Sequence, residues 1–275
     1  MDKLCFGTGG TPHSSKDAST ISGIERIREL GLDSMELEFV RGVHMKEELA
    51  VEVKKRAKSL DVRLSAHGPY FINLNAQERS KVRASIERVL QTARIGFAAG
   101  CLSVTFHPAY YMKQEPARVY DTVEERLAGI VKTLREEGNP VLVRPETTGR
   151  LTAFGSLDEV IRLSQDIEGV LPCVDFSHLH AREGKVNTCD EFAEVLTKLE
   201  DGLGRGILSN MHCHVQGIEY TAKGEKTHLN LSDSDFNYAE LMEAFKEFKI
   251  RGLIVCESPN LEDDAMLLKK TYESL

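Results

Sequence analysis

Short apolar runs alternate along the whole chain with longer segments in which apolar and charged residues recur at helical spacing. Apolar runs rich in β-branched residues predict strands. We place eight of them near Leu4–Gly7, Ser34–Phe39, Arg63–Ala66, Ser103–Phe106, Pro140–Arg144, Leu171–Val174, Leu208–Met211 and Gly252–Cys256. Between them, Ala84–Ala98 carries apolar residues three and four positions apart and ends at Gly100, which predicts a helix, and Thr122–Glu137 is similar. The repeated unit is a strand followed by a helix.

This alternation predicts an α/β fold, but it fits a doubly wound open sheet as well as a closed barrel. The residue that follows the apolar run of each strand, from the third to the eighth, decides between them. These residues are His67, His107, Glu146, Asp175, His212 and Glu257. In a barrel, the C-terminal ends of all strands meet at one mouth. We therefore predict a single (β/α)8 TIM-barrel domain over residues 1–275, in which no linker or low-complexity stretch divides the sequence.

Each of these six residues alone has an ordinary explanation, because a histidine in a loop is usually hydrogen-bonded and a carboxylate often caps a helix. Six in succession at one mouth favour a metal site. Asp175 and His178 stand three residues apart directly after a strand, so both can reach the mouth. Strand alternation points His214 the same way as His212, and we take His212 as the ligand.

Composition is that of a soluble globular protein, with 41% hydrophobic and 28% charged residues in 275. The six cysteines are scattered without a C-x-x-C pair, which is typical of reduced thiols in the cytoplasm. Neither a secretory signal nor a run of roughly 18 apolar residues is present, so we expect a cytoplasmic protein without a membrane span. The net charge of −8 argues against non-specific adhesion to nucleic acid, and bound divalent metals would offset part of that charge locally.

Six segments, spread through most of the chain, together resemble the endonuclease IV family of apurinic/apyrimidinic (AP) endonucleases, which shares the xylose isomerase-like TIM-barrel fold. They are HGPYFINL (67–74), FHPAYY (106–111), RPETTG (144–149), CVDFSHLHA (173–181), MHCH (211–214) and CESPN (256–260). The resemblance implies a DNA-repair hydrolase that holds three zinc ions at the barrel mouth and cleaves double-stranded DNA beside abasic sites.

The resemblance also implies a role for each matching residue. His67 and His107 would bind one zinc, Glu146 would bridge it to a second held by Asp175, His212 and Glu257, and His178 and His228 would bind the third. One departure matters, because the family has an aspartate two residues before the last histidine and this chain has Lys226. Either Glu225 substitutes for it, or the third metal is weak or absent and two ions act. Mn²⁺ is a second option for the metal, although a nitrogen-rich first site favours Zn²⁺.

The implied reaction is the attack of a metal-bridged hydroxide on phosphorus, 5′ to the abasic site, with Glu146 and Glu257 as the catalytic residues. Tyr70 and Phe71 match the positions that wedge into the duplex, and the alternative of core packing is favoured more for Phe71 than for Tyr70. Arg41, together with Lys223 and Lys226, is a candidate for phosphate contacts. We expect a monomer.

The main alternative is a metal-dependent sugar isomerase or epimerase of the same superfamily. Glu146, Asp175, His212 and Glu257 also resemble the single-metal site of ketose epimerases, in which two glutamates move protons on either face of a carbon. Such a site does not need His67 and His107, so these two histidines and the HGPYFINL segment favour the nuclease. A non-catalytic protein on a retained barrel would be expected to have lost several ligands, and none of the first six is lost.

Overall fold

Eight strands form one parallel sheet in the order β6-β4-β3-β2-β1-β12-β9-β8, in a computed structural model that describes residues 2–275. Their bounds are β1 Leu4–Gly9, β2 Ser34–Glu38, β3 Arg63–His67, β4 Ser103–Phe106, β6 Leu142–Pro145, β8 Val174–Asp175, β9 Met211–Val215 and β12 Gly252–Cys256. Two antiparallel pairs lie outside this sheet. They are β5 (Ala109–Tyr110) with β7 (Ala153–Phe154), and β10 (Gly217–Thr221) with β11 (Gly224–Leu229).

Helices follow the strands along the chain, which is the arrangement of a (β/α)8 fold. Their bounds are α1 Thr20–Glu29, α2 Glu47–Ser59, α3 Arg79–Ala99, α4 Pro116–Glu136, α5 Leu157–Asp166, α6 Phe176–Glu183, α7 Cys189–Leu203, α8 Tyr238–Glu247 and α9 Glu262–Ser274, with 3₁₀ turns η1 Arg205–Ser209 and η2 Leu231–Asp233. None of the described helices has an apolar stretch long enough to traverse a bilayer.

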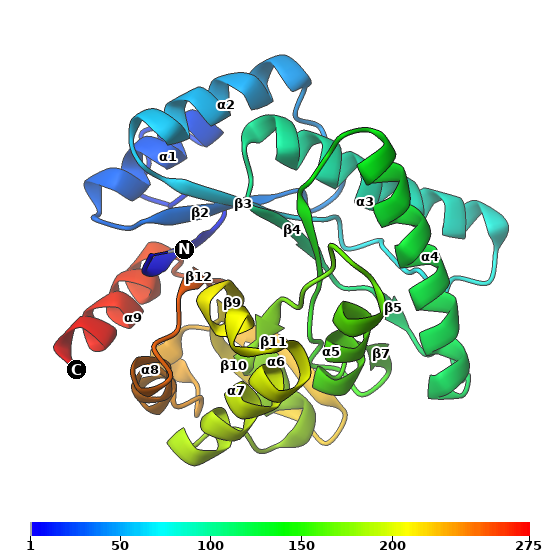
Figure 1. Cartoon of the computed structure of the whole chain (residues 1–275). Coiled ribbons are helices and arrows are strands. Elements are labelled where there is room, and N and C mark those ends of the chain that lie inside the picture. Colours follow the sequence, from blue (N-terminus) through cyan, green and yellow to red (C-terminus); the bar gives the residue numbers. More distant parts are fainter. Residues whose placement is uncertain (1) are drawn as a thin grey trace. The chain divides into compact units, whose positions relative to one another are not determined.

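Contacts group the described residues into two compact units. Unit 1 contains the N-terminal residues to Met35, Gly149–Leu151 and Cys173–Leu275, and unit 2 contains Glu36–Thr148 and Thr152–Pro172. In unit 2, β4 pairs with β3 and β6, and α3 packs on β4 and on α4 (Figure 1). In unit 1, β12 pairs with β1 and β9, β9 pairs with β8, and α9 packs against β1 and β12.

The segment 170–175 is paired at both of its ends. Val170 forms a parallel bridge with Val143 of β6 inside unit 2, and Val174 pairs with Cys213 of β9 inside unit 1. Val170 and Val174 therefore each pair with a strand of their own unit. The predicted (β/α)8 class is confirmed by the eight parallel strands and the helices that follow them.

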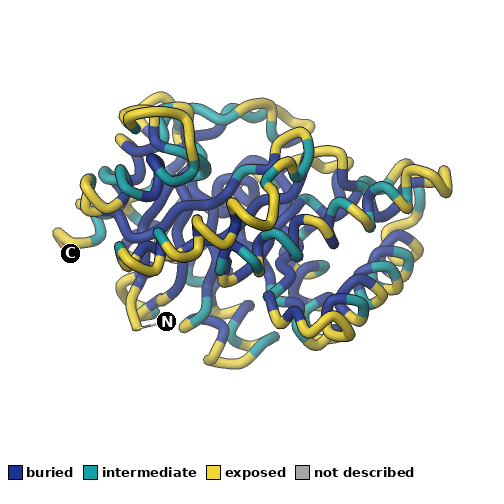
Figure 2. The backbone as a smooth tube through the Cα atoms, turned by 90° about the horizontal axis from the view of Figure 1, so that it is seen from above, coloured by how far each residue is buried: buried dark blue, intermediate teal, exposed yellow. Residues whose placement is uncertain are grey.

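The strands of the eight-stranded sheet are largely buried, whereas most helices bury one side only (Figure 2). Every residue of β4, β9 and β12 is buried, as expected for parallel strands that are covered on both faces. The helix ends follow local sequence rules. Ser156 and Glu159 form a capping box at the start of α5, and Gly100 ends α3 with a positive φ of 78°, a conformation that glycine adopts without strain.

Two predicted strands share a single residue with the observed ones, and the first is Leu171–Val174, of which only Val174 lies in β8. The range Leu208–Met211 covers a 3₁₀ turn and only the first residue of β9, which runs on to Val215. The apolar pattern failed here because His212 and His214 are strand residues that are 1% and 0% exposed, although both are polar. An inward-facing polar pair breaks the apolar run that a buried parallel strand normally has.

Candidate metal centre

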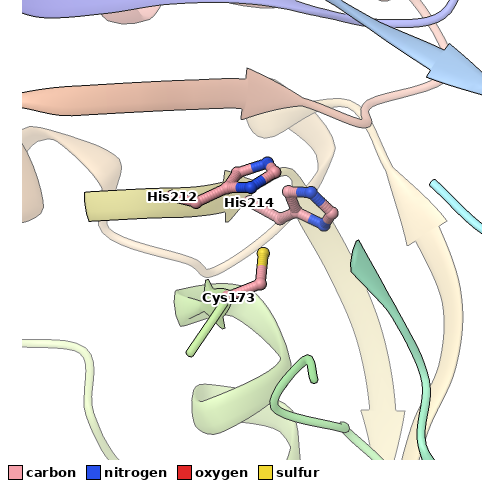
Figure 3. Close-up of side chains that lie close together, drawn as sticks. All are labelled: Cys173, His212 and His214. Atoms are coloured by element: carbon pink, nitrogen blue, oxygen red, sulfur yellow. The ribbon is translucent and has the colours of Figure 1, made fainter. Parts of the chain in front are cut away.

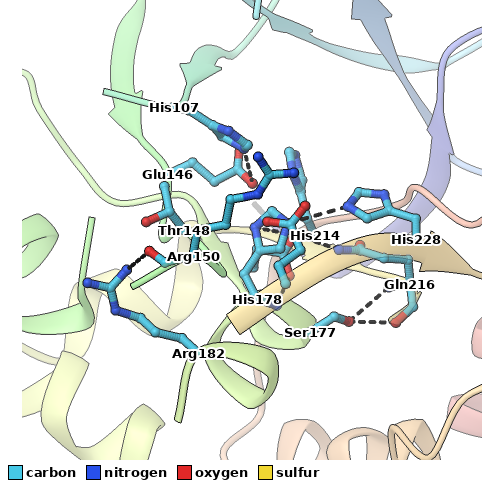
Figure 4. A network of polar contacts seen from close by, with 12 residues as sticks. His107, Glu146, Thr148, Arg150, Ser177, His178, Arg182, His214, Gln216 and His228 are labelled. Carbon is cyan, nitrogen blue, oxygen red and sulfur yellow. Dashed lines mark hydrogen bonds and ion pairs between the residues drawn. The ribbon is translucent and has the colours of Figure 1, made fainter. Parts of the chain in front are cut away.

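Three side chains from successive strand ends meet in unit 2. They are His67 at the end of β3, His107 directly after β4 and Glu146 directly after β6. His67 Nε2 lies 3.0 Å from Glu146 Oε2, and His107 Nε2 lies 3.3 Å from Glu146 Oε1 (Figure 4 draws the latter pair). Glu146 is fully buried, and the side chain of His107 is 32% exposed. All three offer a ligand atom within 4.8 Å of the others.

The hydrogen bond of His67 indicates what this group can bind. His67 Nδ1 lies 2.7 Å from the carbonyl oxygen of Gly68, and because a carbonyl only accepts, Nδ1 carries the hydrogen. In a neutral ring, the lone pair of Nε2 then points at the carboxylate of Glu146. Two facing lone pairs are stabilised by a cation between them, so the residues present fit a metal ion. A backbone acceptor on the far nitrogen is also the usual partner of a metal-binding histidine.

Asp175, His214 and Glu257 form a second group, in unit 1. Asp175 pairs with His214 in the parallel register of β8 and β9, and His214 Nδ1 lies 3.5 Å from Glu257 Oε1. Both oxygens of Asp175 are held: the backbone N–H of His178 donates to Oδ1 at 2.7 Å, and Gln216 Nε2 donates to Oδ2 at 2.8 Å. Sequence reasoning missed Gln216, which is fully buried and stands two residues after His214 on the same inward-facing alternation.

This geometry corrects one ligand assignment. We expected His212, but the structure places His214 beside Asp175 and Glu257, and places His212 with Cys173 and His214 instead (Figure 3). The register explains the difference, because Asp175 lies opposite His214 while His212 stands two residues earlier in the strand. His214 therefore replaces His212 in our candidate set.

His178, Glu225 and His228 form a third group in unit 1. His178, on α6, has its Nε2 at 3.4 Å from His228 Nε2 and at 3.5 Å from Glu225 Oε2. On its other side, His178 Nδ1 lies 3.1 Å from Asp175 Oδ2, so this ring is oriented by a carboxylate (Figure 4). The sequence left open whether Glu225 substitutes for the missing aspartate, and the structure brings Glu225 close to His178 and His228.

A β-bulge explains how Glu225 reaches this place. In the β10–β11 hairpin Tyr220 pairs with Glu225 and Glu219 pairs with Thr227, so Lys226 is an extra residue in β11. Glu225 and His228 are three positions apart, and in a regular strand they would face opposite sides. The extra residue lets both face the same side. Lys226 turns away from the group, and its Nζ donates to Glu219 Oε1 at 2.6 Å. It is therefore neither a ligand nor an unpaired cation.

The candidate DNA-wedging residues lie on the surface of unit 2. Tyr70 and Phe71 are each 61% exposed, so the core-packing alternative is wrong for both. The ring of Tyr70 lies 6.4 Å from that of His67, and its backbone N–H donates to Val40 O, which places it beside the exposed Arg41. Sequence reasoning missed Arg88, whose guanidinium lies 5.9 Å from the centre of the Phe71 ring and donates to Phe71 O.

Comparison with known proteins identifies a family model and several relatives of this chain. A family model described as the xylose isomerase-like TIM barrel matches residues 24–274. An uncharacterized protein of Methanocaldococcus jannaschii is 42% identical over 273 residues, which cover 99% of this chain and 98% of that protein. A probable endonuclease 4 of Streptomyces coelicolor is 26% identical over 157 residues, covering 54% of this chain and 52% of that protein.

Two solved structures resemble the whole chain equally well. Endonuclease IV from Thermus thermophilus has a TM-score of 0.73 at 16% identity, with 98% of both chains covered. A D-tagatose 3-epimerase-like protein also has a TM-score of 0.73, at 20% identity, with 98% of this chain and 96% of that chain covered. At such identities the likeness establishes the fold, and the choice of reaction depends on the side chains at the candidate metal centre.

Proposed function

The chain belongs to the xylose isomerase-like TIM barrel family, and we propose that it is a metal-dependent phosphodiesterase of the AP endonuclease type, which hydrolyses the DNA backbone 5′ to abasic sites. The observation that carries the proposal is the group His67, His107 and Glu146. An epimerase needs one metal ion, and the group of Asp175, His214 and Glu257 would hold it. A single-metal epimerase would not need the two other groups, which are His67 with His107 and Glu146, and His178 with Glu225 and His228.

Charge balance supports the assignment to phosphodiester chemistry. Cleavage of a phosphodiester places negative charge on the attacking and leaving oxygens, and closely spaced zinc ions, when bound, neutralise this charge and supply a hydroxide at neutral pH. The residues of this chain would orient these ions. Gln216 and the backbone of His178 fix Asp175, and Asp175 in turn fixes the ring of His178. Each ligand is thereby held before substrate arrives.

Substrate would meet an exposed aromatic edge in unit 2. Tyr70 and Phe71 present large apolar surfaces to solvent, and Arg41 lies beside Tyr70. An aromatic ring can occupy the place of a missing base, and an arginine can contact the phosphate next to it. In unit 1, Arg150 and Lys223 are exposed and adjacent, since the N–H of Leu151 donates to Lys223 O. Lys223 stays a candidate phosphate contact, and Arg150 takes the place of Lys226, because Lys226 is paired with Glu219.

The test uses zinc-loaded protein and a labelled duplex with one abasic site. We expect a single incision 5′ to that site, which leaves a 3′-hydroxyl, and we expect a chelator to abolish it. A duplex without an abasic site is the control substrate, and Glu146→Gln is the control variant, because it keeps the size of the side chain and loses its charge. Intact abasic duplex after incubation with protein whose metal content has been verified would refute the proposal.

The epimerase remains the alternative because Asp175, His214 and Glu257 would serve a single-metal sugar site equally well. The two reactions differ in their need for His67. We expect substitution of His67 by alanine to abolish incision, whereas a ketose epimerase would retain turnover. Interconversion of free ketoses by the wild-type protein, together with an intact abasic duplex, would support the epimerase.

A further inference from the structure

A buried thiol lies close to two buried imidazoles in unit 1, next to the group of Asp175, His214 and Glu257. Cys173, His212 and His214 each offer a ligand atom within 4.8 Å of the other two (Figure 3). Their exposed fractions are 0%, 1% and 0%. The imidazole rings of His212 and His214 lie edge to face, with their centres 5.3 Å apart. This cluster has no role in the proposed reaction, apart from the presence of His214 in both sets.

The strand register explains why the three side chains meet. Val174 pairs with Cys213 and Asp175 pairs with His214, so Cys173 lies level with His212 in the parallel ladder. Because side chains alternate between the two faces of a strand, Cys173 and Asp175 share one face with His212 and His214. The result is two levels: Asp175 and His214 near the strand ends, and Cys173 and His212 one level deeper. Cys213 points to the opposite face.

The donor set of the deeper level differs from that of the upper level. A thiolate and two imidazoles are soft and borderline donors, which select Zn²⁺ or Cu⁺ over Mg²⁺, Ca²⁺ or Mn²⁺. Burying a thiol and two imidazoles on one inward face costs free energy unless their polar atoms are hydrogen-bonded or bind a cation. A site closed to solvent on all sides is typical of structural metal ions, whereas catalytic metals keep a position open.

We propose that Cys173, His212 and His214 form an inner binding site for a thiophilic cation, zinc or copper(I). His214 belongs both to this site and to the group with Asp175 and Glu257, and its Nδ1 is the atom nearest Glu257. Occupation of the inner site is therefore linked to that of the upper site through one ring. Binding releases the thiol proton to solvent, because the thiolate is the form that ligates.

The experiment is X-ray absorption at the zinc edge on the full-length protein loaded with zinc alone. We expect one sulfur scatterer at about 2.3 Å, the usual zinc–thiolate distance. Cys173→Ala should remove this signal and reduce the zinc content by one ion per chain. Cys213→Ala is the matched control, since this residue is equally buried on the same strand as two of the ligands and faces the other way. The control should retain the sulfur signal.

A parallel arm with copper(I) at the copper edge identifies the preferred cation. If Cys173→Ala does not fold, His212→Ala replaces it and should lower the sulfur scattering of bound zinc, because the thiolate keeps only one imidazole partner. Absence of a sulfur scatterer in both metal-loaded wild-type forms would overturn the proposal, as would a signal that survives in Cys173→Ala. Neither result depends on incision of abasic DNA, so failure of this site is distinguishable from failure of the proposed function.

Discussion

A single methyl group added at Gly149 should disable the third metal group without replacing any ligand. Gly149 lies in unit 1 next to the β10–β11 hairpin, and the backbone N–H of Glu225 donates to Gly149 O at 2.9 Å. A Cβ atom at this position would lie 2.6 Å from Glu225 Cβ and 3.1 Å from His178 Cδ2. Two of the three members of the group would therefore be displaced by Gly149→Ala.

The size of the displacement follows from these contacts. Ordinary carbon contacts begin at 3.4 Å, so Glu225 must move by about 0.8 Å, whereas metal–ligand distances tolerate only about 0.2 Å. Rotation of the side chain brings no relief, because the clashing atom is Cβ and moves with the backbone of β11. We expect overpacking to cost about 1–3 kcal/mol of folding free energy, and zinc affinity at this group to fall at least about tenfold.

Zinc content after dialysis against a competing chelator measures the outcome. Wild-type protein should retain one ion more per chain than Gly149→Ala, with both proteins folded by circular dichroism. Gly129→Ala is the control, since a Cβ there would meet nothing within 4 Å in the middle of α4. It should gain about 0.5–1 kcal/mol of stability and keep its zinc. A full zinc complement in Gly149→Ala would refute the assignment of Glu225 as a ligand.

Three further changes test other parts of the site and of the fold. His107→Ala should abolish incision of abasic duplex while the urea midpoint changes little, because this side chain is one-third exposed and contributes a ligand to the mouth instead of core packing. Gln216→Leu should weaken zinc binding by about 10–100-fold, because Asp175 loses the hydrogen bond that orients it. Asp33→Asn should make the free energy of unfolding depend less on pH in the acid range. Burial raises the pKa of Asp33, but hydrogen bonds from two lysines outweigh burial and lower the pKa below its ordinary value. Its stabilising effect is therefore present above the ordinary carboxyl pKa and is lost as pH falls through the lowered one.

Each of these three predictions has an outcome that would contradict it. Retained incision by His107→Ala would show that the first group is not needed for the reaction. Unchanged zinc affinity in Gln216→Leu would mean that Asp175 is oriented by other contacts. If the urea midpoints of Asp33→Asn and the wild type fall in parallel as the solution is acidified through the carboxyl range, the ion pairs of Asp33 do not govern acid stability.

The sequence predicted the positions of most strands because parallel barrel strands are continuous apolar runs. The strand predicted at Gly252–Cys256 has the bounds that the structure gives β12. The ends of these runs also predicted His67, His107 and Glu146, which the structure brings together. The prediction of β9 and of its ligand failed because His212 and His214 are polar residues inside a buried strand. A pattern of apolar residues ends such a strand too early.

The rest of the site could not be derived from spacing. Glu225 and His228 share one side only because Lys226 is an extra residue opposite the other strand of the hairpin, and no local sequence rule fixes that bulge. The proximity of Cys173 to His212 depends on the register between two strands that lie far apart in sequence. Pairing register is decided by tertiary packing, which a single sequence does not reveal.

The hairpin of β10 and β11 supplies two members of the third group, yet it adds no strand to the eight-stranded sheet. Insertions, deletions or substitutions within it leave the ladder of the barrel intact. The third group can therefore change, or lose its capacity for a metal ion, without any change in the pairing of the barrel strands.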